Sequence, residues 1–303
     1  MHSKNFYHTC QGVALENTPD TFGYFLDSSD IAHDGEALRK RMDEEGYLYV
    51  PGFLNRNKVL KVRDLVLRML QEEGSLHPEF PFEEGVLAPG NDLRFRPELV
   101  RDLPEIKDVL YNGEMMEFMG RFFDETVLHF DYTWFRSMSR GNGTPPHCDI
   151  VYMGRGTKRL YTAWVPYVSI SLEVGGLMIL ERSHQQAERL KSYLEMDVDT
   201  YCLNKDFGEH NDPKGWRFSG ALTKNARTLR KRLGGRWLTT EYEPGDLLLF
   251  SMATVHASLD NKTDRVRLSS DSRYQRASEP VDHRWIGKNP IAHGAEGKRG
   301  LIC

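Results

Sequence analysis

His147, Cys148 and Asp149 stand together, and His256 lies much later in the chain, after an apolar run at 247–252. Residues i and i+2 of a strand point to the same side, so His147 and Asp149 can reach one ion while Cys148 faces away. Two imidazoles and one carboxylate form the facial triad of non-heme Fe(II) enzymes, a ligand set that also suits Mn(II) or Co(II). A chain that assembles this set has to bring distant strands together.

The His-X-Asp pattern is weak on its own, because the chain has 11 histidines. His129, Phe130 and Asp131 repeat the same letters in an aromatic segment with no partner set, so we interpret them as structural. His184 is expected to make a strand-end or loop contact. Three further histidines are expected at the surface or in loops: His210, His283 and His293.

The overall composition indicates which partners to expect. With 40 basic and 44 acidic residues, the charge is nearly balanced, which gives no case for binding nucleic acid or an anionic membrane. The four cysteines are scattered without a CxxC pair, which favours a reducing cytoplasm. No apolar run reaches membrane-spanning length. We therefore expect a cytoplasmic protein with a small-molecule partner and leave its oligomeric state open.

The order of sequence patterns predicts a helical layer followed by strands. Helical spacing or composition marks 36–45, 55–74 and 105–123, a β-rich run occupies 47–50, and 75–100 is expected to be a long loop. Short β-type runs follow at 127–138, 161–172, 177–180, 237–242, 247–252 and 267–274.

These patterns predict a mainly β (α+β) fold with a barrel or double-sheet jelly-roll core. We expect a single domain over 1–303. Its N-terminal helical layer spans about 30–125, its core about 126–276, and a helix-prone insertion about 184–236.

Several ordered motifs resemble the phytanoyl-CoA dioxygenase family of Fe(II)- and 2-oxoglutarate-dependent oxygenases, whose core is a double-stranded β-helix. The resemblance covers roughly 36–276 and is weak at 75–125 and in the insertion. Its motifs are the opening strand 45–54, Thr162-Ala163-Trp164-Val165-Pro166, Gly175-Gly176-Leu177, Arg182-Ser183-His184, Gly245-Asp246 and His256-Ala257-Ser258 with Asn261 and Arg267.

The resemblance implies a role for each matching position. It makes His147, Asp149 and His256 the iron ligands, and it pairs Arg267 with the C5 carboxylate of 2-oxoglutarate. Arg265 lies on the same strand face as Arg267, and only the family spacing separates the two.

Four further residues are weaker candidates. Trp164 matches a tryptophan near the co-substrate, although a core role fits equally well. Ser258 and Arg136 are candidates either to support a metal ligand or to contact the co-substrate. Trp134 lines either the substrate pocket or the core.

The implied activity is that of a dioxygenase that uses Fe(II), 2-oxoglutarate and O2 to hydroxylate or similarly oxidise a small molecule, releasing succinate and CO2. Related halogenases replace the carboxylate ligand, so the presence of Asp149 favours hydroxylation. Substrate specificity is expected in 75–125 and 184–236. The basic run at 228–236 could meet an anionic substrate, but we interpret it as a solvated helix face. Two alternatives remain: a metal-dependent non-redox enzyme on a cupin-like barrel, and a non-catalytic scaffold.

Overall fold

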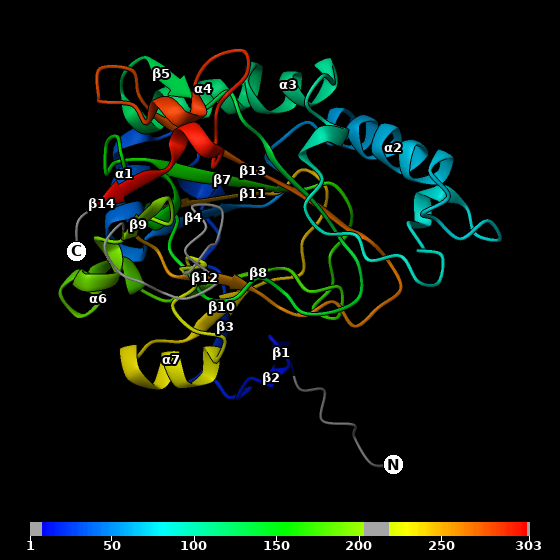
Figure 1. The fold of residues 1–303 in the computed structure, drawn as a ribbon, viewed down its shortest axis with the longest axis horizontal. Helices are drawn as coiled ribbons and strands as arrows, with labels where there is room; N and C mark the ends of the chain where they lie inside the picture. The colour runs from blue at the N-terminus through cyan, green and yellow to red at the C-terminus, as the bar shows by residue number, and fades with distance from the viewer. Residues whose placement is uncertain (1–7, 203–217, 302–303) are drawn as a thin grey trace.

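The computed structural model describes residues 8–202 and 218–301, and two β-sheets organise this part of the chain (Figure 1). The larger sheet has the order β4 (Tyr47–Val50), β11 (Leu247–Ser251), β7 (Tyr161–Pro166), β13 (Arg267–Arg276) and β5 (Val127–His129), with β6 (Trp134–Met138) also paired to β13. The smaller sheet has the order β12 (His256–Ser258), β8 (Leu177–Leu180), β10 (Trp237–Thr239) and β3 (Phe22–Tyr24).

The inner faces of the two sheets pack against each other. Trp164 and Phe250 of the larger sheet share a buried cluster with Ile179 and Leu238 of the smaller one. Alternation along each strand sends the neighbouring residues outward, so that Ala163 belongs to a different cluster beneath the helices. The sheets do not close into a barrel, and the predicted jelly-roll core takes the form of two facing sheets.

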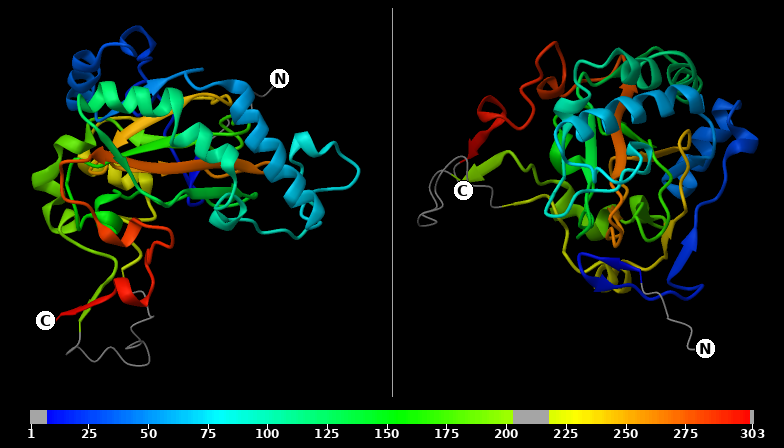
Figure 2. Two further views of the ribbon diagram at one scale, coloured as in Figure 1. Left: turned by 90° about the horizontal axis from the view of Figure 1, so that it is seen from above. Right: turned by 90° about the vertical axis from the view of Figure 1, so that its right-hand side faces the viewer.

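Helices cover the outer face of the larger sheet. In the right-hand view of Figure 2, the light-blue to green helices lie over the sheet that holds the orange strand β13. Their apolar stripes supply much of the cluster beneath them, including Val62, Leu70 and Phe118. These helices are α1 (Gly35–Glu45), α2 (Arg56–Glu72), α3 (Pro104–Leu110) and α4 (Gly113–Phe123).

Most predicted elements of this layer are present, but the single helix expected over 105–123 is wrong. The chain forms two helices, α3 and α4, because Tyr111 leaves the helical conformation and Asn112 is extended. Gly113 then begins the second helix at a φ of 48°. Several strands are also shorter than predicted, since β7 ends at Pro166 and β10 at Thr239.

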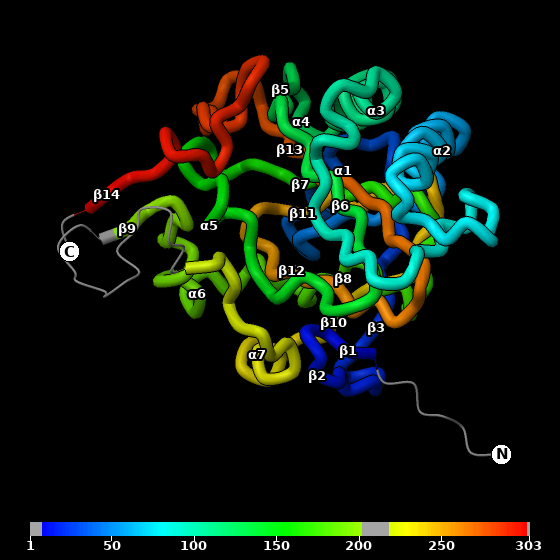
Figure 3. The backbone as a smooth tube through the Cα atoms, turned by 45° about the vertical axis from the view of Figure 1, so that its right-hand side comes forward, coloured from blue at the N-terminus to red at the C-terminus, as the bar shows by residue number. Residues whose placement is uncertain are grey.

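The predicted insertion and the C-terminal segment meet beside the core. β9 (Thr200–Cys202) pairs in parallel with β14 (Arg299–Leu301), and Figure 3 shows the two strands side by side. The described part of the insertion also contains α6 (Ala187–Leu194) and α7 (Ala226–Leu233). Two aromatic residues of the insertion, Phe207 and Trp216, lie outside the described residues. The described residues also form the short helix α5 (Ile150–Met153) and a hairpin of β1 (Thr9–Cys10) and β2 (Val13–Ala14).

Within 8–202 and 218–301, no helix has both the length and the apolar character needed to cross a membrane.

Candidate active site

His147, Asp149 and His256 come together as predicted, between the two sheets. Their ligand atoms all lie within 4.8 Å of one another, and all three residues are buried. Oδ1 of Asp149 is 3.9 Å from Nε2 of His147 and 3.6 Å from Nε2 of His256. Across the described residues, no other group of histidine, cysteine and acidic side chains has metal-binding geometry.

Backbone carbonyls orient both imidazoles. Nδ1 of His147 is 2.8 Å from the carbonyl oxygen of Pro145, and Nδ1 of His256 is 3.0 Å from that of Thr254. In the neutral ring Nδ1 therefore carries the proton, and Nε2 presents its lone pair to the shared space. Burial lowers the pKa of His147 to about 3 and also lowers the pKa of His256, so both rings are neutral near pH 7.

The carboxylate of Asp149 is held through the oxygen that does not face the histidines. Thr162 on β7 donates its hydroxyl to Oδ2, and Nη2 of Arg273 on β13 donates to the same oxygen over 2.9 Å. Burial alone would raise the pKa of Asp149, but the Arg273 guanidinium, the two histidines and the Thr162 hydroxyl together outweigh it and hold that pKa well below its ordinary range. Oδ1 is thus a permanently ionised oxygen directed at the histidines.

The local backbone explains how residues so far apart in sequence meet. His147 and His256 form an antiparallel bridge, in which each N–H donates to the other's carbonyl. The chain does not continue as a strand, because Asp149 is already helical (φ −65°, ψ −24°) and precedes α5. The side chain of Cys148 points away and is buried, with its thiol 3.3 Å from the carbonyl oxygen of Ala253. The prediction that Cys148 faces away from the ligands is correct.

Arg267 lies at the start of β13 and is 3% exposed. Its Nη1 donates to the carbonyl of Gly175, which has a φ of +86° and no room for a Cβ, because a Cβ would lie 2.5 Å from the carbonyl oxygen of Leu259. Nε of Arg267 and Oγ of Ser269 are buried without a hydrogen-bond partner. Burial, together with the nearby Arg136, lowers the pKa of Arg267 to about 10, which still leaves it cationic near pH 7.

Three other residues named in the sequence analysis make contacts of different kinds: Trp164, Ser258 and Arg265. Trp164 is 1% exposed and packs on Tyr242, with ring centroids 4.6 Å apart. Oγ of Ser258 accepts from the backbone N–H of Thr144, three residues before His147, and so ties that segment to β12. Arg265 is exposed and pairs with Glu84 at 2.8 Å, which distinguishes it from the buried Arg267.

Two residues beside Asp149 belong to the site, and the sequence interpretation assigned no role to Arg273 or Thr162. The side chains at 267, 269, 271 and 273 share the inner face of β13, since Leu268 and Tyr274 pack beneath the helices. The same alternation that places Arg267 therefore places Arg273, and the signal was present in the sequence. Trp134, one of the predicted candidates, packs its ring against Arg273, with Cζ 4.2 Å from the ring centroid.

The other histidines that the structure describes are not part of the metal-binding group. Nδ1 of His129 contacts the carbonyl of Phe130, which agrees with a structural role. His184 contacts the carbonyl of Asp43 at 3.0 Å, as a loop contact. His283 is exposed and His293 half-buried, while His210 lies outside the described residues.

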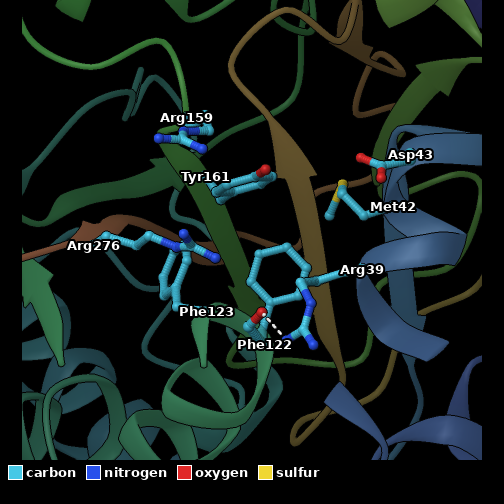
Figure 4. Close-up of a pocket in the computed structure, with 8 residues that line it drawn as sticks. All are labelled: Arg39, Met42, Asp43, Phe122, Phe123, Arg159, Tyr161 and Arg276. Carbon is cyan, nitrogen blue, oxygen red and sulfur yellow. Dashed lines mark hydrogen bonds between the residues drawn. The ribbon is translucent and has the colours of Figure 1, made fainter. Parts of the chain in front are cut away.

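A cavity of about 170 Å³ on the outer face of the larger sheet is separate from the triad. Figure 4 shows it beside Tyr161, with Phe122, Phe123, Arg39 and Arg276 around it. Arg39 already donates to the carbonyls of its neighbours in α4. The cavity holds neither a metal-binding group nor an inner-face residue of β7, so the chemistry belongs to the opposite face of this sheet.

The two facing sheets and the triad define a non-heme metal enzyme with a double-stranded β-helix core. The family model described as phytanoyl-CoA dioxygenase (PhyH) matches residues 42–269, and the chain belongs to this family. It is thereby an enzyme of the Fe(II)- and 2-oxoglutarate-dependent dioxygenase class, which uses O2, as the sequence predicted.

Relatives and solved structures agree with this assignment. The chain is 26% identical over 269 residues to 1-deoxypentalenic acid 11-beta-hydroxylase of Streptomyces arenae, covering 86% of this chain and 87% of that protein. The fold matches apo EctD from S. alaskensis with a TM-score of 0.57 and 13% identity, over 95% of this chain and 94% of that one. The alpha-ketoglutarate-dependent carbocyclase SnoK of nogalamycin biosynthesis gives a TM-score of 0.57 with 16% identity, over 82% of this chain and 87% of that one.

The residues present fit the metal and co-substrate of the class. Two neutral Nε2 atoms and one ionised carboxylate oxygen meet at a single point, which is a donor set that suits Fe(II). The unpartnered Nε of Arg267 and hydroxyl of Ser269 fit an incoming carboxylate, which would satisfy both groups.

Proposed function

We propose that this protein hydroxylates, or similarly oxidises, a C–H bond of a small-molecule substrate and releases succinate and CO2. The observation that carries the proposal is the convergence of Asp149 Oδ1 with the Nε2 atoms of His147 and His256. Bound Fe(II) and 2-oxoglutarate supply the oxidising chemistry. The relative of 26% identity is itself named a hydroxylase, which supports this outcome over other oxidations.

Each proposed role rests on a contact of the free protein. His147, Asp149 and His256 hold the metal, and Thr162 and Arg273 fix the carboxylate so that only Oδ1 faces it. Arg267 binds the C5 carboxylate of 2-oxoglutarate, supported by its burial and its unpartnered Nε. Co-substrate contacts by Trp164 and Ser258 stay predictions.

Retention of Asp149 supports hydroxylation over halogenation, since the aspartate fills a coordination position that a halide would need. The cytoplasmic location also stays a prediction, and the two free, buried thiols of Cys10 and Cys148 suit a reducing compartment.

The test is oxygen incorporation. The Fe(II)-loaded protein is incubated with 2-oxoglutarate, ascorbate and ¹⁸O₂ against a panel of metabolites, and products are analysed by mass spectrometry. We expect one compound to gain a single labelled oxygen, with one succinate formed per product. A product that gains oxygen from water alone, formed without 2-oxoglutarate, would instead support the metal-dependent non-redox alternative.

A non-catalytic scaffold predicts a different result. Such a protein would bind neither Fe(II) nor 2-oxoglutarate with useful affinity, and calorimetric titration of both ligands separates it from an enzyme whose substrate is missing from the panel.

A further inference from the structure

The guanidinium of Arg136 is bound on one side by a buried carboxylate. Its Nε donates to Oδ2 of Asp271 over 2.9 Å, and Asp271 is 5% exposed while 24% of the Arg136 side chain remains accessible. No hydrogen bond to another described residue uses its Nη1 or Nη2. The pairing therefore fixes the direction of the side chain and leaves its two terminal nitrogens to bind a ligand.

The location of Arg136 is between the triad and Arg267. On the paired strands, Arg136 stands opposite Ser269, the inner-face position that follows Arg267 on β13. Electrostatic effects agree: Asp149 and Tyr152 act on the pKa of Arg136, and Arg136 in turn lowers the pKa values of His147 and Arg267. Arg136 thus lies near both the metal ligands and Arg267.

The charges lining this interior do not balance. Among the described residues, the three guanidiniums of Arg136, Arg267 and Arg273 face the carboxylates of Asp149 and Asp271. The histidine rings are neutral, and Fe(II) with the dianion of 2-oxoglutarate adds no net charge. Among these groups one positive charge therefore remains, on an inner face where the Arg136 side chain is only partly accessible, and a further anion would offset it.

The neighbouring charged network does not supply that anion. Beside α5, Arg155 pairs with Asp197, Arg284 with Asp199 and Asp282, and Lys298 with Asp199. The described carboxylates of this network are thus already paired with cations of their own and are not directed at the inner face of β6 and β13.

We propose that Arg136 binds a carboxylate carried by the substrate, so that the substrate class is a hydrophobic monocarboxylic acid. The inference rests on the proposed function. Arg267 is assigned to the co-substrate. Arg273 donates through Nη2 to the metal ligand Asp149 and packs on Trp134, although its Nε and Nη1 are also buried without a partner. Arg136 is the remaining guanidinium of this face, and we assign it to the substrate.

Aromatic rings further along the same strand suit the apolar body of such an acid, while the ring that lies nearest the Arg136 guanidinium is Phe95, with its centroid 5.8 Å from Cζ. Trp134 on the same strand packs against Tyr132 and Trp285, with ring centroids 4.7 Å away in each case. These side chains belong to one apolar cluster, to which the C-terminal segment contributes Trp285.

The experiment compares acids with their esters. Protein loaded with Fe(II) and 2-oxoglutarate under anaerobic conditions is titrated with linear and cyclic aliphatic monocarboxylic acids, 1-deoxypentalenic acid among them, each beside its methyl ester. Dissociation constants are measured by calorimetry for the unmodified protein, Arg136→Gln, Arg136→Lys and the exposed control Arg265→Gln. Titration of 2-oxoglutarate into the Fe(II) protein is run for each.

We expect at least one acid to bind about tenfold or more tightly than its ester, consistent with a charged hydrogen bond. Arg136→Gln should remove this preference and keep its 2-oxoglutarate affinity. Arg136→Lys should restore part of the preference, and Arg265→Gln should change nothing. Thermal unfolding and Fe(II) affinity of the variants report whether the site is intact.

Three results would overturn the inference: no acid preferred over its ester, a preference that survives in Arg136→Gln, or a loss of 2-oxoglutarate affinity in that variant. Failure of the proposed function looks different, since the acid preference would then persist without succinate release. Succinate release with neutral compounds alone would support the proposed function and would refute the inference that the substrate carries a carboxylate.

Discussion

Nη2 of Arg273 lies 2.9 Å from Oδ2 of Asp149, and both side chains are 3% exposed. The contact uses the carboxylate oxygen that faces away from the histidines, so it fixes the other oxygen toward them. An ion pair at this depth is not a general source of stability, because the cost of desolvating both charges offsets the attraction. We interpret it as a positioning contact for the metal ligand.

Arg273→Gln should weaken Fe(II) binding by about 10- to 100-fold, the usual effect of losing a group that orients a metal ligand. Competition titrations with Co(II) as a spectroscopic probe measure it. Arg265→Gln is the control, since that arginine is exposed and pairs with Glu84. Unchanged metal affinity in Arg273→Gln would show that Arg273 does not position the metal ligand Asp149.

Arg267→Ala should raise the KM for 2-oxoglutarate by about 100-fold, on the order of 3 kcal/mol for a lost buried charge contact. The kcat at saturating 2-oxoglutarate should fall much less. Arg265→Ala, two residues earlier but exposed and paired with Glu84, is the control and should leave the KM unchanged. Equal effects of the two substitutions would refute the assignment of Arg267.

The stability of the protein should fall in acid partly because of Asp199. This carboxylate is fully buried and accepts from Arg284, His293 and Lys298. Burial alone would raise the pKa of Asp199, but the hydrogen bonds and charges of His293 and Lys298 outweigh it and lower the pKa from its ordinary value of 3.8. The folded pKa is below the unfolded one, so its stabilisation is complete above about pH 5 and is lost as the pH falls below about 4.

Asp199→Asn tests this point by denaturant unfolding at several pH values. The substitution removes one carboxylate partner of the buried Arg284 and should lower the free energy of unfolding near pH 7 by about 3 kcal/mol. Below pH 4, the free energy of unfolding should fall less steeply than in the unmodified protein. Asp264→Asn, at an exposed pair with Arg140, should have no measurable effect. A variant as acid-sensitive as the unmodified protein would contradict the role of Asp199.

Much of the fold and the triad could be predicted because the signals are local or periodic. The helical stripe of α2, the glycine that ends α1 and the spacing of His147 and Asp149 each follow from short-range rules. The break between α3 and α4 was missed, because the apolar pattern continues through Tyr111 and Asn112 while the backbone does not.

The parts that were missed depend on contacts between segments distant in sequence. The pairing of Arg273 with Asp149 requires β13 and the segment before α5 to lie side by side, although the face of Arg273 followed from alternation. No pattern within 280–301 indicated that Trp285 packs on Trp134 or that Arg284 reaches Asp199. Such partners are determined by the tertiary fold and cannot be read from local spacing.

The most direct test of the central claim is succinate formation from 2-oxoglutarate by the unmodified protein and by Asp149→Ala. The account predicts succinate only when Fe(II), 2-oxoglutarate and O2 are all present, and none above background from Asp149→Ala, whose Fe(II) affinity should also fall. An Asp149→Ala variant that turns over 2-oxoglutarate with normal Fe(II) affinity would contradict it.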